Sequence, residues 1–541
     1  MKMITGSQAL VKCLEKEDVK VIFGYPGVAI APFYDSLSQS DIRHILVRNE
    51  QHAGHAASGY ARTTGRPGVC CATSGPGATN LITALATAYA DSIPLIAITG
   101  QVPSDQLGHD VFQEVDITGA AEPFVKYSYL VREASDIPRI MKEAFYIAST
   151  GRKGPVLIDV PSDIQRTEFK DYEPEEAKIR GYKPIKEGNR LQIKKVFEAV
   201  EKAKRPLLCA GGGVILSNAQ DEIRCFCEKT DIPVVSTMMG IGVMPKYHPL
   251  YFGMLGSNGK PYANKAVEEC DLLIIVGARV ADRAITMPAN VEKDSLIVHI
   301  DIDSAEIGKN MGATIPLVGD IKLIAREMLE QGVEAQRKDW LAKLSDIKTN
   351  CVDPRTFHDN YVNPCEMVRL LSEKLEDTAI YVADVGQNQM WSADNYVMKS
   401  GRFITTGGLG TMGYSVPAAI GAKLADPARQ VVAVCGDGSF QMSLTELATM
   451  CQHGVDVKIV VIKNHYLGLV REYQHNIYND NYMAVKLDGS PDFSLIAAAY
   501  GLPYFHAENN EELEPVIDAF LKEEGSALLE CRVYEFDKVK G

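Results

Sequence analysis

The sequence predicts an α/β protein made of three doubly wound domains, each built on a mostly parallel sheet. Short runs rich in Val and Ile alternate with longer segments of helical periodicity, which is typical of parallel sheets covered by helices. Many of these runs end in Gly, Asp or Asn, residues that turn the chain or bind oxygen-rich ligands at strand ends. This layout occurs three times, and two charged stretches separate the three units.

The composition is that of an ordinary globular protein and excludes several classes of partner. Of the 541 residues, 46% are hydrophobic and 23% are charged, a length that suits roughly three domains. The net charge is −14 with no basic block, so we expect no binding to nucleic acid or to an anionic membrane. No apolar run approaches the ~20 residues that span a bilayer, and the amino terminus lacks a signal or transit pattern, so a cytoplasmic protein is expected. The scattered cysteines are expected to be reduced.

Residues 1–165 form the predicted first domain, and residues 166–190 form a linker rich in Lys, Glu and Pro. The strands of this domain run into glycine-rich or acidic turns, as expected of a ligand-binding sheet edge. Its helices are expected at residues 7–16 and 53–63, and its strands at residues 19–23, 44–47, 68–73 and 95–99.

Residues 191–340 form the predicted central domain, residues 341–364 a second charged linker, and residues 365–541 the third domain. The first and third domains are alike in layout, as expected of duplicated domains. Strands of the central domain are expected at residues 206–210, 271–276 and 297–301, and the first of these runs into Gly211-Gly212-Gly213.

Two strand ends in the third domain carry residues that suit a metal ion and a diphosphate. One apolar run ends in Gly436-Asp437-Gly438, and the run over residues 458–463 ends at Asn464. Carboxylate and amide oxygens suit Mg²⁺, and the glycines let a diphosphate approach the backbone. An ordinary β-turn is the alternative, but the spacing to Asn464 fits one crossover helix. Ser443-x-x-Glu446 indicates a capping box that opens this helix, and Gly454 ends it.

Three further segments are candidates for which a simple structural explanation stays open. Glu50 lies between a strand and a helix and could equally be an N-cap or a surface carboxylate. The turn Ser74-Gly75-Pro76-Gly77 exposes backbone groups that could hold a flat ligand or could serve only as a loop. The glycine-dense segment over residues 407–413 precedes a helix near Pro417, and a plain turn explains it as well.

Taken together, these segments resemble the thiamine diphosphate enzymes, and most closely the catalytic subunits of the acetolactate (acetohydroxyacid) synthases. The resemblance covers about residues 3 to 534 and rests on several long motifs in one order. The motifs are Tyr25-Pro26-Gly27, Asn49-Glu50-Gln51, residues 73–80, Phe112-Gln113-Glu114, residues 253–256, Asp384-Val385-Gly386-Gln387, Gln389-Met390-Trp391, residues 407–413, and Gly436-Asp437-Gly438 with Asn464.

The resemblance implies that thiamine diphosphate binds with its pyrimidine ring on the first domain and its diphosphate, with Mg²⁺, on the third. Glu50 would protonate the aminopyrimidine ring, a task that needs a carboxyl whose pKa is raised by an apolar pocket. Met412 would be an apolar wedge that bends the cofactor, although core packing is the commoner use of Met. The catalytic set is Glu50, Gln113 and Met412, and the metal set is Asp437, Asn464 and the carbonyl of Tyr466. The implied cofactor contacts are Pro26, Thr73, Pro76, Asn80, Val385, Gly386, Gln387, Asn388, Gly410, Met412, Gly438, Ser439, Tyr466, Leu467 and Gly468.

The central domain carries positions that match the FAD-binding positions of acetolactate synthases. Glycines allow a diphosphate to come close, arginines attract anions, and a strand-end Asp suits a ribose. Read alone, the three glycines after residue 210 fit a plain α/β domain equally well. In this family FAD is largely structural, because the reaction transfers no net electrons. The matching positions are Arg152, Gly211, Gly212, Gly213, Thr237, Met254, Arg279, Arg283, Asp301, Asp320, Gln389 and Met390.

The activity implied is that of an acetolactate synthase in branched-chain amino acid biosynthesis. Pyruvate is decarboxylated, and the two-carbon unit is ligated to a second 2-oxo acid, pyruvate or 2-oxobutanoate, which gives 2-acetolactate when the acceptor is pyruvate. The resemblance also implies a homodimer or homotetramer whose active sites are shared between chains, and it leaves a small regulatory subunit open. The implied substrate contacts are Val28, Phe112, Arg283 and Tyr473.

Several positions near the substrate depart from the family pattern. Val28 replaces a Gly, Ser162 replaces a Lys, and Tyr473 replaces a Trp that favours 2-oxobutanoate. They motivate an alternative activity, that of a related decarboxylase, oxidase or C–C lyase acting on another 2-oxo acid or diketone. A non-catalytic binding or regulatory homologue is a third hypothesis, which the intact catalytic motifs oppose. Further departures are Asn258, Val280, Ala281 and Asn388, and the chain stops at Gly541, short of the family's apolar tail.

Overall fold

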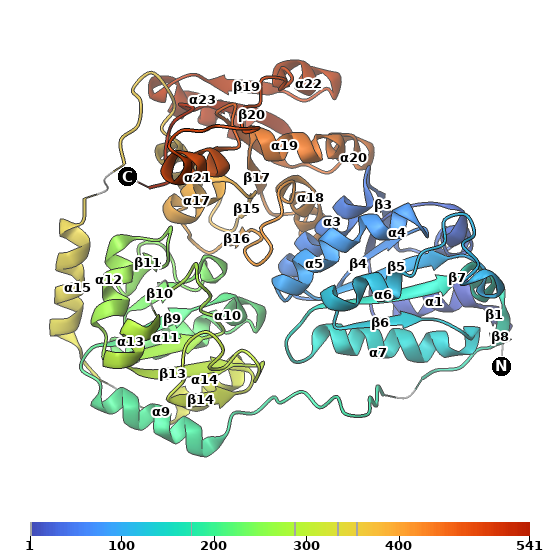
Figure 1. Cartoon of the computed structure of the whole chain (residues 1–541), viewed down its shortest axis with the longest axis horizontal. Coiled ribbons are helices and arrows are strands. Elements are labelled where there is room, and N and C mark those ends of the chain that lie inside the picture. The colour runs from blue at the N-terminus through green and yellow to red at the C-terminus, as the bar shows by residue number, and fades with distance from the viewer. Residues whose placement is uncertain (1–2, 175, 286–287, 333–334, 353–354, 541) are drawn as a thin grey trace.

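The computed structural model describes residues 3–174, 176–285, 288–332, 335–352 and 355–540, and in it three α/β units lie side by side (Figure 1). Each unit is built on a six-stranded sheet, and the strands in each of these sheets pair in parallel. The predicted fold class, three doubly wound α/β domains, is therefore confirmed.

The first and third sheets have the same topology. Their strand orders are β3-β2-β4-β5-β7-β6 and β16-β15-β17-β18-β20-β19, which are the same arrangement when each sheet is counted from its first strand. The likeness in layout that the sequence indicated thus extends to the order of the strands. The strands are β2 (Val21–Tyr25), β3 (Arg43–Leu46), β4 (Gly68–Ala72), β5 (Leu95–Gln101), β6 (Tyr127–Leu130) and β7 (Pro155–Pro161) in the first unit, and β15 (Ile380–Ala383), β16 (Arg402–Ile404), β17 (Val431–Gly436), β18 (Lys458–Lys463), β19 (Tyr504–Ala507) and β20 (Ala527–Arg532) in the third.

The central sheet has the order β11-β10-β9-β12-β13-β14, which is that of dinucleotide-binding sheets. The direction of winding reverses between β9 and β12, and ligands bind such sheets at this switch point. The strands are β9 (Pro206–Ala210), β10 (Val234–Ser236), β11 (Tyr251–Met254), β12 (Leu272–Val276), β13 (Leu296–Asp301) and β14 (Ile315–Val318).

Helices cover both faces of the sheets because alternate strand residues are apolar on both sides. In β5, Ile96 and Ile98 pack into one core cluster, whereas Leu95 and Ala97 pack into another. The helices of the first unit are α1 (Gly6–Lys16), α2 (Ala31–Leu37), α3 (Glu50–Thr64), α4 (Pro76–Asn80), α5 (Ile82–Ala90), α6 (Ile117–Ala121), α7 (Ile137–Ser149) and α8 (Ser162–Arg166). Those of the central unit are α9 (Arg190–Lys202), α10 (Gly212–Leu216), α11 (Gln220–Thr230), α12 (Pro261–Glu269), α13 (Pro288–Asp294) and α14 (Ile321–Glu330). Those of the third unit are α16 (Pro364–Lys374), α17 (Gln387–Asn395), α18 (Ser415–Ala425), α19 (Asp437–Ser443), α20 (Leu447–His453), α21 (Gly468–Tyr478), α22 (Phe493–Ala499) and α23 (Asn510–Lys522).

The stretches predicted as linkers contain regular structure. Within residues 166–190, strand β8 (Glu168–Lys170) pairs antiparallel with β1 (Met3–Thr5) at the edge of the first unit. Within residues 341–364, most of the first half belongs to helix α15 (Lys338–Asn350), whose Trp340 is buried against the central unit. Charge content marked both stretches as connections, but each keeps a few apolar residues that anchor it.

The capping box predicted at Ser443 is wrong. Helix α19 already begins at Asp437, directly at the end of β17, and the side chain of Ser443 makes no capping hydrogen bond. A short 3-10 turn over Leu444–Glu446 follows, and Glu446 turns its carboxylate toward the first unit instead. The predicted end at Gly454 is confirmed, since this residue closes α20 in the left-handed conformation with φ of 60°.

Helices α3 and α18 join the first and third units through direct backbone contact. A Cβ atom on Gly59 of α3 would lie 1.9 Å from the carbonyl oxygen of Ala418, and one on Gly421 of α18 would lie 1.8 Å from that of Ala56. Any side chain at either glycine would push the helices apart. The relative position of the two units is therefore fixed by close packing, which Figure 1 shows where α3 and α18 meet.

Two properties expected from composition can be described in the structure. No helix among the described residues has the length and apolar character needed to cross a membrane. The cysteines are free thiols, and most of them are buried in the cores of the three units.

Candidate active site

Two polar residues meet at neighbouring strand ends of the third unit. Asp437 follows β17 and is almost fully buried, with 1% of its surface exposed, and its Oδ2 accepts a hydrogen bond of 2.9 Å from the amide of His465. Asn464 follows β18; its Nδ2 donates to Gln387 Oε1 over 2.8 Å, and its Oδ1 accepts from the amide of Tyr466 over 2.9 Å. Burial raises the pKa of Asp437 to about 6, and a cation bound beside it would favour its ionised form further.

This donor set fits Mg²⁺. A single buried carboxylate and an amide oxygen leave most of the coordination sphere to phosphate oxygens and water, which is how proteins usually hold this ion. Among the described residues there is no group of three or more His, Cys, Asp or Glu that could bind a metal. A metal at Asp437 would therefore depend on oxygens brought by a bound phosphate compound.

Two glycines in the surroundings of this pair lie where neighbouring side chains leave no room for a side chain of their own. A Cβ atom on Gly468 would lie 1.8 Å from Gln387 Oε1, and one on Gly438 would lie 3.0 Å from Leu467 and 3.7 Å from Met412 Cε. Helices α17 and α21 both begin here, and helix N-termini favour anions. The predicted diphosphate contacts gathered at this edge are Val385, Gly386, Gln387, Asn388, Met412, Gly438, Ser439, Tyr466, Leu467 and Gly468.

A buried carboxylate, Asp384, holds the glycine-dense segment that carries Met412. Its Oδ1 accepts from the amide of Gly413 over 2.9 Å, and its Oδ2 accepts from that of Ser415 over 2.7 Å. Burial raises the pKa of Asp384, and the amide donors oppose this effect. Nearby, Gly410 has a φ of 73° and open space where a side chain would stand. The sequence reasoning quoted Asp384 as part of a motif but gave it no role.

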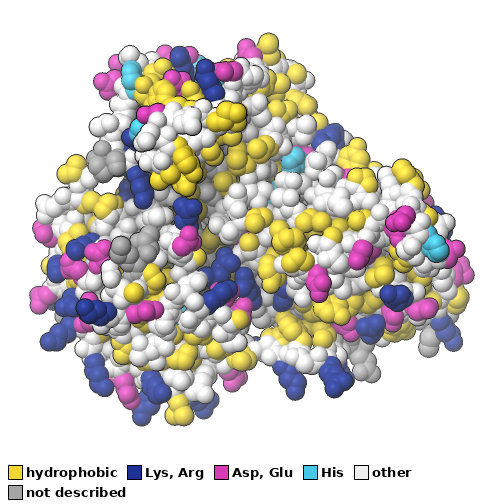
Figure 2. All heavy atoms as spheres, in the orientation of Figure 1, with side chains coloured by type: hydrophobic (Ala, Val, Ile, Leu, Met, Phe, Trp, Pro, Cys, Tyr) yellow, Lys and Arg dark blue, Asp and Glu magenta, His cyan; other side chains and the backbone are white. Residues whose placement is uncertain are grey.

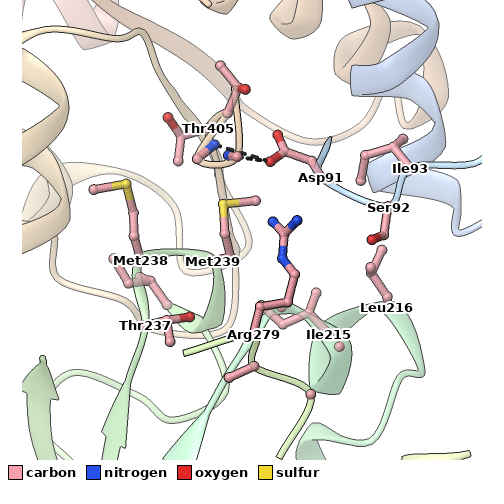
Figure 3. Close-up of a pocket in the computed structure, with 18 of the residues that line it drawn as sticks. Asp91, Ser92, Ile93, Ile215, Leu216, Thr237, Met238, Met239, Arg279 and Thr405 are labelled. Carbon is pink, nitrogen blue, oxygen red and sulfur yellow. Dashed lines mark hydrogen bonds between the residues drawn. The ribbon is translucent and has the colours of Figure 1, made fainter. Parts of the chain in front are cut away.

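Asp91 at the end of α5 holds the start of the same segment from the first unit. Its Oδ1 accepts from the amides of Gly407 (3.3 Å) and Gly408 (2.7 Å), as Figure 3 shows, and its Oδ2 pairs with Arg62 at 2.7 Å. The sequence reasoning missed Asp91, because a lone Asp after an Ala-rich helix carries no local signal. Its partners lie 316 and 317 residues further along the chain.

The residues predicted around the pyrimidine ring gather at the sheet edge of the first unit. Glu50 is the first residue of α3, and its Oε2 accepts from Asn80 Nδ2 over 2.9 Å. A Cβ atom on Gly77 would lie 3.3 Å from Glu50 Oε1, so this turn runs directly beside the acid. Gln113 lies against Gly75 with a left-handed φ of 61°, and Thr73 packs on the turn of Pro26 and Gly27.

Among the described residues, no hydrogen bond or ion pair joins the cluster around Glu50 to the cluster around Asp437. Large apolar side chains beside each cluster are instead exposed: Val28 by 82% and Phe112 by 87% on the first unit, and Tyr473 by 57% on the third. Isolated exposed residues are common, but bulky apolar groups at both halves of a site suggest a surface that is covered by another chain.

A cavity of about 1760 Å³ lies between the units, at the switch point of the central sheet. Figure 3 shows Arg279 reaching into it between Met239 and Leu216. Burial raises the pKa of Asp301, at the end of β13, to about 6. The predicted FAD positions that line this cavity are Arg152, Gly212, Gly213, Thr237, Met254, Arg279, Arg283, Asp301, Asp320, Gln389 and Met390.

Gly211, the remaining predicted FAD position, lies under the cavity rather than in its wall. A Cβ atom there would lie 2.2 Å from the carbonyl oxygen of Gly277, so this glycine permits close contact between two turns. Arg152 is already paired within the chain, with Ser92 (3.0 Å), Asp303 (3.3 Å) and Glu306 (2.8 Å). A large cavity with glycine turns and a strand-end carboxylate fits a dinucleotide.

The predicted substrate residues fall into two groups. Arg283 and Tyr473 line the cavity, whereas Val28 and Phe112 belong to the exposed rim of the first unit. Of the positions that depart from the family pattern, Asn258, Val280 and Ala281 also line the cavity. Ser162 is buried at the start of α8 and does not line it.

The last described residues of the chain fold back over helices α17 and α21. Arg471 donates to the carbonyls of Glu535 and Asp537, the second bond measuring 2.8 Å. Gln387 Nε2 also donates to the Asp537 carbonyl over 2.8 Å, and the amide of Val539 donates to Glu472 over 2.9 Å. The carboxyl-terminal segment is therefore tied to the residue that orients Asn464.

Comparison with known proteins places this arrangement in a family. Three models of thiamine pyrophosphate enzymes match in succession: the N-terminal TPP binding domain over residues 4–120, the central domain over residues 193–328, and the C-terminal TPP binding domain over residues 384–531. The acetolactate synthase of Arthrospira platensis is 44% identical over 98% of this chain and 95% of its own length. A probable acetolactate synthase large subunit of Methanocaldococcus jannaschii is 45% identical over 96% of this chain and 90% of its own length. The acetolactate synthase large subunit of Lactococcus lactis is 42% identical over 95% of this chain and 90% of its own length.

Proposed function

This chain belongs to the thiamine pyrophosphate enzymes and, among them, to the acetolactate synthase large subunits, and on this ground we propose that it makes 2-acetolactate. Pyruvate loses CO₂, and its two-carbon unit is joined to a second 2-oxo acid, pyruvate or 2-oxobutanoate, in branched-chain amino acid biosynthesis. Bound thiamine diphosphate supplies the carbanion chemistry, and the chain supplies binding, orientation and proton transfer.

The observation that carries this proposal is the buried pair Asp437–Asn464 at two adjacent strand ends. In the proposed site these two residues and the Tyr466 carbonyl hold Mg²⁺, which in turn binds the diphosphate. Met412 lies beside Gly438 and supports the cofactor from its apolar side. Glu50 gives a proton to the aminopyrimidine ring, and Gln113 contributes to the same half of the site.

The proposed active site is shared between two chains. The exposed Val28 and Phe112 of the first unit, and the exposed Tyr473 on helix α21, which begins shortly after Asn464, support this arrangement. Covering them with a second copy would exclude water from the reacting groups. A homodimer is then the smallest active unit, and a homotetramer is compatible with it. In the same proposal, the three domains of each chain span residues 1–165, 191–340 and 365–541.

The proposed second cofactor is FAD, bound in the cavity of the central unit. The support is the dinucleotide-type strand order, the turns at Gly212, Gly213 and Gly277, and Arg279 reaching into the cavity. Because the reaction is redox-neutral, the flavin would serve to hold the three units together. Since the relatives are named large subunits, a small regulatory subunit is a further proposed partner, and the cytoplasm is the proposed location.

Product analysis tests the proposal directly. The protein is incubated with thiamine diphosphate, Mg²⁺, FAD and pyruvate, then with pyruvate plus 2-oxobutanoate, and acetolactate is measured. We expect acetolactate from pyruvate alone, and a loss of rate of 10²–10⁴-fold, in order of magnitude, in Glu50→Gln, which keeps the size of the side chain but removes the acid. Absence of any carbon–carbon product would contradict the proposal, and bleaching of the flavin by a 2-oxo acid without air would point to an oxidase instead.

A further inference from the structure

One buried carboxylate, Glu446, fastens the turn before helix α3 to the third unit. Its Oε1 accepts from the amide of Arg48 over 2.9 Å and from His52 Nδ1 over 2.8 Å, because a carboxylate can only accept. Its Oε2 accepts from the hydroxyl of Thr449 over 2.6 Å. The side chain of Glu446 is completely buried, and that of His52 is 6% exposed.

These contacts bracket the proposed catalytic acid. Arg48 lies two residues before Glu50 and His52 two residues after it, and both bind the same oxygen of Glu446. Between them, Asn49 caps α3 by accepting from the amide of Gln51 over 2.9 Å. The backbone at Glu50 is thus held from the third unit, while its carboxyl group is held by Asn80 from the first.

The strength of this attachment follows from its burial. A carboxylate in a dry interior makes stronger hydrogen bonds than one in water, and each donor left without its acceptor there is costly. The close contact of α3 with α18 on the next turns leaves little freedom for the helix to shift in compensation. The start of the helix is therefore held both by Glu446 and by the local cap of Asn49.

We propose that Glu446 is a positioning residue for Glu50: it fixes the start of α3 so that the acid lies at the correct distance from the aminopyrimidine ring. This inference rests on the proposed role of Glu50 in proton transfer. Glu446 itself touches neither substrate nor cofactor. Proton transfer requires heavy-atom distances of about 2.6–3.2 Å, and a misplacement of about 1 Å can cost on the order of 10²-fold in rate.

Two readouts test the proposal in the full-length protein. The first is amide hydrogen exchange of residues 46–52 in the cofactor-free protein. We expect exchange about tenfold or more faster in Glu446→Ala and an intermediate change in Glu446→Gln, whose amide oxygen still accepts. The second is exchange of the C2 proton of thiamine diphosphate bound with Mg²⁺, followed by NMR. We expect it to slow by on the order of 10²-fold in Glu446→Ala and by less in Glu446→Gln.

Gln452→Ala is the matched control. This residue belongs to α20, and its Oε1 accepts from the exposed guanidinium of Arg48 at 2.6 Å, so both readouts should stay unchanged. The double variant Glu446→Ala/Glu50→Gln should exchange the C2 proton no more slowly than Glu50→Gln alone, because Glu446 acts through Glu50.

The outcomes separate the two proposals. If Glu50→Gln slows C2 exchange but neither variant of Glu446 does, or if the effects of Glu446 and Glu50 multiply, the positioning role is wrong and the role of Glu50 stands. If Glu50→Gln leaves C2 exchange unchanged, the proposed function of Glu50 fails, and the positioning role fails with it. Should Glu446→Ala not fold, Glu446→Gln decides the question alone.

Discussion

The cavity of the central unit and the two thiamine half-sites differ in how much of a site one chain provides. The cavity is lined by residues of all three units of the same chain, and its acidic residue Asp301 is buried at a strand end. By contrast, no hydrogen bond or ion pair among the described residues joins the clusters around Glu50 and Asp437, and large apolar side chains of their two units, such as Val28 and Tyr473, are exposed.

This difference teaches which site depends on assembly. Exposed bulky apolar groups are unfavourable in water and are covered in stable interfaces, so we expect the half-sites to be completed by burial against another chain. The cavity is instead lined by one chain, although some of its lining side chains, Tyr473 among them, are exposed. We therefore expect a flavin to bind to a single chain and thiamine chemistry to require two.

Mixing two inactive variants gives the largest expected effect on this comparison. Glu50→Ala and Asp437→Ala should each lose activity by 10²–10⁴-fold in order of magnitude, the first by losing the acid and the second by losing the metal. If sites are shared, a mixed dimer keeps one intact site. Half of randomly formed dimers are mixed, so about a quarter of wild-type activity should return after dissociation and reassembly. The measurement is acetolactate formation before and after mixing.

The control for this experiment is a pair of variants altered in the same half-site, Glu50→Ala mixed with Asn80→Ala. No arrangement of these chains restores an acid with its partner, so activity should stay low. If mixing Glu50→Ala with Asp437→Ala restores no more activity than this control mixture, each chain carries a complete thiamine site. The comparison drawn from the exposed rim would then be wrong.

Much of the fold could be predicted because its signals are local. Buried parallel strands such as β9, β17 and β18 consist of continuous β-branched and apolar residues, and turn residues mark their ends. The proposed half-sites rest on local signals of the same kind: Asp437 and Asn464 directly follow strands, and Glu50 opens a helix a few residues after β3. Whether they meet across two chains stays a prediction.

The rest could not be predicted, because long-range contacts decided it. Ser443 and Glu446 have the spacing of a capping box, yet the carboxylate binds His52, 394 residues away in sequence. Asp91 likewise binds glycines in another unit. In both cases a tertiary partner replaces the local one, and local patterns cannot distinguish the two.

Asp301 offers a test confined to the cavity. Its pKa is raised from 3.8 to about 6 by burial, so its neutral form stabilises the fold at low pH, and that stabilisation is lost as pH rises through about 6. At pH 8 the free energy of unfolding of Asp301→Asn, measured with urea, should therefore exceed that of wild type by up to about 3 kcal/mol. Near pH 4 the two free energies should be equal. The same variant should bind FAD more weakly, because it loses an acceptor for the ribose.

Asp282→Asn is the control for Asp301, since its side chain lines the same cavity but is 86% exposed. Its unfolding should follow wild type at both pH values. Because the surroundings of Asp301 belong to one chain, its effect should not depend on protein concentration. A pH effect that disappears on dilution would mean that the cavity, too, is completed by assembly.

The smallest expected effect concerns the choice of the second substrate. Val28 and Tyr473 come from different units and are both exposed in one chain, yet both are proposed to line one substrate pocket in the dimer. Tyr473→Trp should raise the preference for 2-oxobutanoate over pyruvate by about tenfold or less, because changes of one or two carbon contacts carry only modest discrimination.

Val28→Gly should widen the pocket from the other chain. If the residues meet, the double variant will depart from the product of the single effects, as contacting residues do. Product ratios in competition assays measure this coupling, and strictly multiplicative effects would place Val28 and Tyr473 apart.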